Sequence, residues 1–204
     1  MSDSTQSRTD TKRKVRALLA GGVVLGVGAA VTLAAWTDQE WAVGNFAAGS
    51  FNIEGSTDGT AFTDHASEGG AAVLDFQVDA DNLSPTDTVA APFVLRTDAA
   101  TSYPATVELT SAAGTGDNAP NLTYGIVQVD DVGACTPDAT GTEIVPAATS
   151  LDSIAGAAGF ALEAGADGTA GAPVALCLQV TAGEDLEQGA AGTASWEFTA
   201  TSEE

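Results

Sequence analysis

Beyond Gly44 the chain alternates hydrophobic and polar residues in short runs, and a cluster of turn-forming residues follows each run. In residues 72–80, AVLDFQVDA, hydrophobic side chains occupy every second position from Leu74 onward. A period of two is typical of β-strands with one face in the core and the other in water. The same pattern predicts strands in further segments, namely residues 49–55, 91–97, 105–111, 122–130, 174–182 and 193–201.

The segments between these predicted strands contain turn residues and no long helical pattern. Residues 80–87, 112–121 and 165–173 are rich in Gly, Pro, Asn and Asp, which favour turns and loops. Residues 151–165 fit a short helix or an irregular crossover, and their glycines favour the crossover because each costs about 1 kcal/mol relative to alanine in a helix. Many short strands without a long helix predict an all-β fold, an antiparallel β-sandwich.

The N-terminal residues have a different pattern, a basic segment followed by an uncharged apolar run. Five of the six basic residues lie within residues 1–16. This pattern predicts a helical secretory signal at residues 1–34, with its apolar part at 17–34 and cleavage between Ala34 and Ala35. The alternative is a retained anchor, since the run is long enough to cross a bilayer as a helix. The positive charge predicts that the basic segment stays in the cytoplasm while the rest leaves the cell.

The distribution of charge restricts the partners of the predicted exported part. The whole chain has 28 acidic and 6 basic residues. Without residues 1–34 it keeps 28 − 2 = 26 acidic residues and one basic residue, Arg96, so its formal charge is 1 − 26 = −25. Such a protein repels nucleic acid and anionic lipid, so we expect neither as a partner, and contact with a membrane only through the signal before cleavage.

Residue patterns typical of a catalytic site are absent from the sequence. The one histidine, His65, lies in a polar stretch, and no serine lies in a G-x-S-x-G pattern. There is also no H-E-x-x-H pair to bind zinc. We therefore expect no enzymatic activity, no catalytic residues and no cofactor. No metal site is predicted, although Asp79 and Asp81 could offer oxygen ligands to a loosely bound Ca²⁺.

The two cysteines, Cys135 and Cys177, both lie in the predicted exported part. A disulfide between them would stabilise the fold by about 4 kcal/mol in the chain-entropy model. Two independent buried thiols are the alternative. No C-x-x-C spacing is present, which disfavours a metal-binding or redox role.

The residues around the predicted cleavage site resemble those of a known family. Residues 34–38 are a pair of small residues, an aromatic residue, a polar residue and Asp, and residues 46–53 read Phe-x-x-Gly-x-Phe-x-Ile. This resembles the TasA and camelysin-type proteins of Gram-positive bacteria, which signal peptidases of the SipW class process. The match covers roughly residues 15–55, and the rest agrees in its general pattern only. One departure is that the family's usual Pro-Gly turn reads Pro85-Thr86 here.

The resemblance implies a secreted β-sandwich of jelly-roll type at the cell surface or in the biofilm matrix. Some family members assemble into extracellular fibres, in which the N-terminal segment of one subunit completes the sheet of the next. The implied partners are therefore copies of the same chain and a SipW-type signal peptidase. Some members have been labelled metalloproteases, but this sequence lacks the zinc-binding residues.

Residues 35–50 meet the physical requirements of a donated strand, and we call them the arm. An extended segment can add main-chain hydrogen bonds to an open sheet edge while its side chains fill pockets. Aromatic side chains dominate such interfaces, and the candidate assembly residues are Trp36, Asp38, Trp41, Phe46 and Phe51. Two alternatives stay open: the tryptophans of the arm pack on their own domain, or the protein is a secreted monomeric module that binds carbohydrate or protein.

Overall fold

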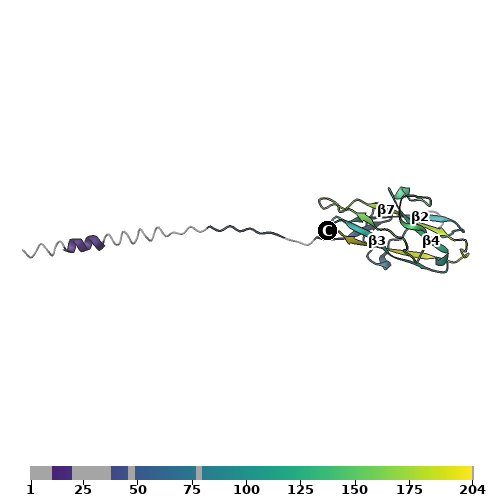
Figure 1. Cartoon of the computed structure of the whole chain (residues 1–204), viewed down its shortest axis with the longest axis horizontal. Coiled ribbons are helices and arrows are strands. Elements are labelled where there is room, and N and C mark those ends of the chain that lie inside the picture. Colours follow the sequence, from purple (N-terminus) through teal and green to yellow (C-terminus); the bar gives the residue numbers. More distant parts are fainter. Residues whose placement is uncertain (1–10, 20–37, 46–48, 77–79, 204) are drawn as a thin grey trace, which may run out of the picture. The chain divides into compact units, whose positions relative to one another are not determined.

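The computed structural model describes residues 11–19, 38–45, 49–76 and 80–203. The chain divides into two units, Met1–Phe46 and Ala47–Glu204. In the first unit residues 11–19 are α-helical, and residues 38–45 have no regular secondary structure (Figure 1). Among the described residues, no helix has the length and hydropathy needed to span a membrane. The predicted cleavage site at Ala34 and Ala35 lies outside the described residues.

The second unit is an antiparallel β-sandwich, as the alternating pattern predicted. Its described residues form the strands β1 (Ile53–Ser56), β2 (Thr88–Thr97), β3 (Ala105–Thr115), β4 (Leu122–Val129), β5 (Thr142–Ser150), β6 (Phe160–Leu162), β7 (Val174–Ala182) and β8 (Thr193–Ser202). One sheet has the order β1-β2-β7-β4-β5 and the other has the order β6-β3-β8. Short 3₁₀ helices are η1 (Glu68–Gly70), η2 (Ala119–Asn121) and η3 (Val132–Ala134).

The topology is that of a jelly roll in which the first strand is displaced. In a jelly roll whose eight strands are numbered along the chain, one sheet has the order β2-β7-β4-β5 and the other has the order β1-β8-β3-β6. Both orders are present here except for β1, which pairs with β2 at the edge of the larger sheet. The place beside β8 is therefore not taken by a paired strand in the described part of the chain.

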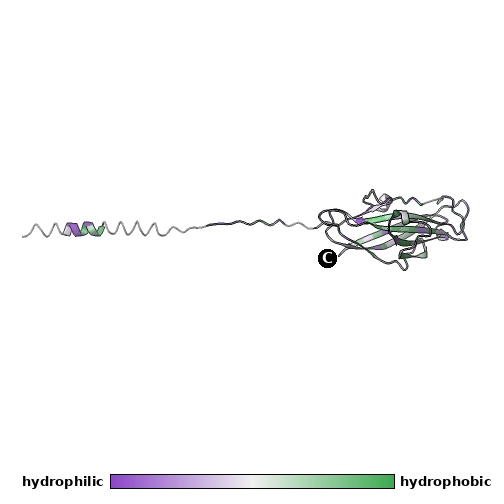
Figure 2. Cartoon of the chain, turned by 90° about the horizontal axis from the view of Figure 1, so that it is seen from above, coloured by the Kyte–Doolittle hydropathy of each residue, from purple (hydrophilic) through white to green (hydrophobic). Residues whose placement is uncertain are grey.

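The hydrophobic core lies between the two sheets, and β7 is at its centre. Leu176, Leu178 and Val180 of β7 belong to the main core cluster. Cys177, which points to the opposite face of the same strand, belongs to a smaller buried cluster. Figure 2 shows hydrophobic stretches running along the strands of the sandwich. Because the second unit has its own core and its own disulfide, we expect it to fold by itself.

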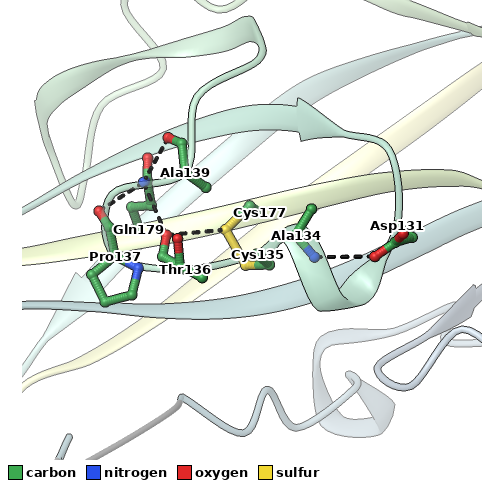
Figure 3. The surroundings of a disulfide bond; sticks show 8 residues. All are labelled: Asp131, Ala134, Cys135, Thr136, Pro137, Ala139, Cys177 and Gln179. Atoms are coloured by element: carbon green, nitrogen blue, oxygen red, sulfur yellow. Dashed lines mark hydrogen bonds between the residues drawn. A yellow bond between two sulfur atoms is a disulfide. The ribbon is translucent and has the colours of Figure 1, made fainter.

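A disulfide joins Cys135 to Cys177 (Figure 3). The prediction of a bridge is therefore confirmed, and the alternative of two independent buried thiols is wrong. The bridge fastens the loop after η3 to the outer face of β7. The side-chain amide of Gln179 reinforces this attachment, because its Nε2 donates to three carbonyl oxygens of the loop. Their distances from Nε2 are 3.2 Å for Thr136, 2.9 Å for Pro137 and 3.1 Å for Ala139.

Four segments differ from the strand predictions. Of the predicted strand 49–55, only residues 53–55 belong to β1 (Ile53–Ser56). Residues 72–76, the described part of the run 72–80, form no strand although their sequence alternates. Strand β5 was not predicted, because Pro146 and the alanines around it weaken its strand pattern. The crossover 151–165 forms turns and no helix, as predicted, but it also contains the three-residue strand β6.

Thr86 has a strained conformation in the turn before β2. The N–H of Asp87 donates to the carbonyl of Ser84 at 3.0 Å, which closes a four-residue turn with Pro85 second and Thr86 third. Thr86 has a φ of 75°. The third position of such a turn suits glycine, whereas a β-branched residue is strained there.

We expect the substitution Thr86→Gly to raise the free energy of unfolding by about 1 kcal/mol. Relief of backbone strain, about 1–3 kcal/mol, exceeds the cost of the extra freedom of glycine in the unfolded chain, about 0.5–1 kcal/mol. Urea denaturation followed by tryptophan fluorescence measures the change. Thr88→Gly, in the extended strand β2, is the control and should destabilise. A Thr86→Gly variant that is less stable than the parent would contradict the assignment of strain.

Candidate functional site at the edge of strand β8

Strand β8 is a long edge strand whose outer side pairs with no strand in the described part of the chain. It is 10 residues long and contains no proline. It pairs with β3, and no second strand pairs with its other side within residues 49–76 and 80–203. Its outer row of main-chain N–H and C=O groups is therefore available to an added strand. Long, regular edges of this kind readily pair with another chain.

The other three sheet edges are protected. In β1, Gly55 exchanges two main-chain hydrogen bonds with Thr63, at 2.9 and 3.0 Å. Strand β5 contains Pro146, and Ala148 has a φ of 63°, both of which interrupt a regular edge. Strand β6 has only 3 residues. Bulges, proline and short length are the usual means by which proteins block unwanted strand addition, so β8 is the edge best suited to a partner.

The side of β8 that faces the core is only half-buried. Its residues there are Ala194, Trp196, Phe198 and Ala200, and none of the ten residues of β8 is fully buried. In the neighbouring β3, by contrast, Ala105, Val107 and Leu109 are buried. Because β3 pairs with a strand on both sides and β8 on one side, the side chains of β8 are less deeply buried than those of β3.

Trp196 lies at the middle of this edge beside a small cavity. Its ring centroid is 5.6 Å from that of Tyr124 and 6.5 Å from that of Phe76. Its indole Nε1 is buried and has no hydrogen-bond partner among the described residues. The adjacent cavity has a volume of about 110 Å³, and its apolar lining includes Leu83, Val89, Leu122, Leu151 and Trp196. A buried donor without an acceptor costs about 1–3 kcal/mol, so a bound chain that offers a carbonyl here would gain affinity.

Tyr124 supports Trp196 from the core. Only 1% of Tyr124 is exposed, and its hydroxyl donates to the main-chain carbonyl of Ser153 at 2.7 Å. Burial raises the pKa of Tyr124 to about 12, so the phenol stays neutral and keeps this bond under physiological conditions. Both residues lie in segments that the sequence predicted as strands, and the structure buries Tyr124 fully and Trp196 in part.

The described part of the arm exposes its hydrophobic side chains. In residues 38–45 Trp41 is 90% exposed and Val43 is 89% exposed. Asp38 contacts only its neighbour in the chain, since its Oδ1 accepts a hydrogen bond from the N–H of Gln39 at 2.9 Å. Trp36 and Phe46 lie outside the described residues. Within the first unit, therefore, nothing buries Trp41.

Phe51, the last of the candidate assembly residues, lies in the second unit. Its side chain is 39% exposed. The residues on either side of it are tied to the turn after β2. The carbonyl of Asn52 accepts from the N–H of Asp98 at 3.1 Å, and that of Ser50 accepts from the N–H of Ser102 at 3.3 Å. Phe51 thus belongs to the sandwich and follows the arm.

The other polar candidates have local structural roles. Nε2 of His65 lies 3.2 Å from the hydroxyl of Thr63. Arg96 pairs with Glu54 at 2.9 Å, and its guanidinium lies 3.8 Å from the centroid of the Phe62 ring. Asp81 is exposed at a turn. Across the ranges that the structure describes, no three His, Cys, Asp or Glu side chains are grouped so that they could hold a metal ion. Asp79 is not among the described residues.

A carboxylate in the loop after β1 closes a tight turn. Oδ1 of Asp58 accepts hydrogen bonds from the main-chain N–H groups of Ala61 and Thr60, both at 2.8 Å. These bonds, first that of Ala61, hold the pKa of Asp58 well below its usual range. A carboxylate whose bonds are all made within its own loop organises that loop, so we assign Asp58 no role in binding.

Among the described residues, then, the edge of β8 with its half-buried hydrophobic face is the best-formed binding surface. Sequence reasoning placed Trp196 and its neighbour Phe76 in predicted strands but did not identify either as part of a binding surface. Both carry the alternating strand pattern, but the pattern alone does not tell an edge strand from a central one. The chain matches no protein-family model and no curated protein.

Proposed function

We propose that the protein is a secreted structural protein of the cell surface or extracellular matrix, whose copies assemble into fibres by strand donation. In this proposal the arm of one copy, residues 35–50, adds to the edge of β8 in the next. The observation that carries the proposal is the long, unpaired and half-buried edge of β8. The exposed Trp41 and Val43 of the arm and the resemblance to TasA-type proteins support it.

The arm has the side-chain spacing that strand addition requires. Trp41 and Val43 are two residues apart, so in an extended chain they lie on the same face. Burial of two such side chains contributes on the order of 4 kcal/mol, and main-chain hydrogen bonds along β8 add to it. A head-to-tail contact of this kind does not close on itself, so repetition produces a filament.

Export controls when the arm becomes available. A SipW-type signal peptidase that cuts between Ala34 and Ala35 would release the arm outside the cell. The released subunit has a formal charge of 1 − 26 = −25, so neighbouring subunits repel one another. Added salt shortens the range of this repulsion, and loosely bound Ca²⁺ would reduce it further. Assembly should therefore strengthen with ionic strength.

Two fragments test the proposal by light scattering. The protein that begins at Ala35 should form large assemblies, and more of them as NaCl or CaCl₂ is added. The protein that begins at Asn45 keeps the whole sandwich but lacks Trp36 and Trp41, so it should remain monomeric under the same conditions. Circular dichroism verifies that both are folded. Monomers from both fragments would favour the monomeric binding module, and casein hydrolysis blocked by a chelator would contradict a non-enzymatic role.

A further inference from the structure

Residues 71–76 already cover the edge of β8 without pairing with it, and we call this segment the strap. Its side chains alternate, with Ala72, Leu74 and Phe76 half-buried and the residues between them exposed. Leu74 and Phe76 pack against the main core cluster, whereas Val73 is 88% exposed. The strap nevertheless has no strand structure, and the described residues contain no main-chain hydrogen bond between it and β8.

The N-terminal end of the strap lies beside β1 and the loop that follows it. Ala72 lines a cavity of about 130 Å³ together with Gly55 and His65. Gly55 lies against the ring of Phe93, because a Cβ added there would be 2.7 Å from Cζ of Phe93. The Phe93 ring centroid is in turn 5.9 Å from that of Phe198 in β8.

The other end of the strap lies near the start of β8. The Phe76 ring is 6.5 Å from that of Trp196. The residues that follow in the chain, Ala80 and Leu83, line the cavity beside Thr193. Phe76, Ala80 and Leu83 therefore place the C-terminal end of the strap, and the residues after it, beside the first half of β8. The strap occupies the place that the first strand of a jelly roll would fill.

The strap is attached to β8 by side chains only. Besides the contact between Phe76 and Trp196, the hydroxyl of Ser195 lies 3.4 Å from Oε1 of Glu68, in η1 just before the strap. A strand that also paired its main chain with β8 would make the same kind of side-chain contacts and a ladder of hydrogen bonds in addition. The strap is thus a weaker occupant of this edge than a fully paired strand.

We propose that the strap is a placeholder, and that the arm of a second copy binds β8 by displacing residues 71–76. This inference rests on the proposed function and specifies how the acceptor edge is regulated. Trp41 and Val43 have the same spacing as Leu74 and Phe76, so one extended arm can present two hydrophobic side chains to the surface that the strap leaves. A free subunit keeps the hydrophobic edge of β8 covered until an arm arrives.

A synthetic peptide of residues 35–50, added to the fragment that begins at Asn45, tests the inference. The fragment carries Leu74→Cys, and the reaction of this thiol with a maleimide is timed with and without peptide. The two native cysteines do not interfere, because they form a buried disulfide. Peptide binding is measured independently by fluorescence anisotropy of a labelled peptide. If the strap is displaced, the thiol at position 74 should react at least about tenfold faster with saturating peptide.

Val73→Cys is the matched control, because residue 73 is already exposed and its rate should not change with peptide. A peptide that binds while the rate at position 74 stays the same or falls would overturn the placeholder and leave strand donation intact. A peptide that does not bind the fragment would overturn strand donation and the placeholder together. A second variant, Phe76→Ala, weakens the strap, so it should bind the peptide several-fold more tightly, and unchanged or weaker binding would contradict displacement.

Discussion

Removal of the disulfide by the double substitution Cys135→Ala and Cys177→Ala is expected to lower the free energy of unfolding by about 4 kcal/mol. The bridge spans a sequence separation of 42 residues, so its loss frees a long loop in the unfolded chain. The substitutions also destabilise the native state, because both cysteines are 0% exposed and the bridge holds the loop after η3 against β7. Urea denaturation of the fragment that begins at Ala35, under oxidising conditions, measures the change.

Gln179→Ala is the control for this prediction. It removes the side-chain hydrogen bonds to the same loop but keeps the bridge. The free energy of unfolding should therefore fall by about 1 kcal/mol. If the double cysteine variant lost no more stability than the Gln179→Ala variant, the bridge would not be a main source of stability. Light scattering of the double variant, at a urea concentration where it is still folded, should show unchanged assembly, because neither cysteine lies at the edge of β8.

The second large effect is expected for Leu178→Ala, which should lower the free energy of unfolding by about 3–4 kcal/mol. Leu178 is 0% exposed in the central strand β7, where it lies between Ala91 of β2 and Ile126 of β4. The surrounding strands are held on both sides, so they cannot close the cavity that the substitution leaves. The same urea experiment measures the loss.

The same substitution in the strap, Leu74→Ala, should lower the free energy of unfolding by only about 1 kcal/mol, because Leu74 is half-buried and its segment lacks main-chain pairing. Both variants remove the same atoms, so the difference reports how firmly each site is packed. Equal costs at the two positions would mean that the strap is packed as firmly as the core, which would argue against its displacement by an arm.

The clearest strand to predict was β7. Its bounds, Val174–Ala182, coincide with the predicted segment 174–182, because a run rich in Val, Leu and Cys lies between Pro173 and Gly183. Strand β5 was missed for the opposite reason, since Pro146 and small alanines hide the alternation. The resemblance at the N-terminus drew attention to the arm, but the edge of β8, which we propose as its acceptor, could not be found in the sequence. An edge is a property of the sheet, and no local pattern encodes which side of a strand remains unpaired.

The sequence by itself determined the alternating segments that could form strands, the cysteine pair that could form a bridge, and the strongly acidic character of the chain. It could do so because the pleat of an extended chain has a period of two and charge is a property of composition. Only the tertiary structure decided which alternating runs became strands. Residues 193–202 pair with β3, whereas residues 71–76 have the same alternation but no paired main chain. A strand exists only where a neighbouring backbone accepts and donates its hydrogen bonds, and that neighbour comes from a distant part of the chain.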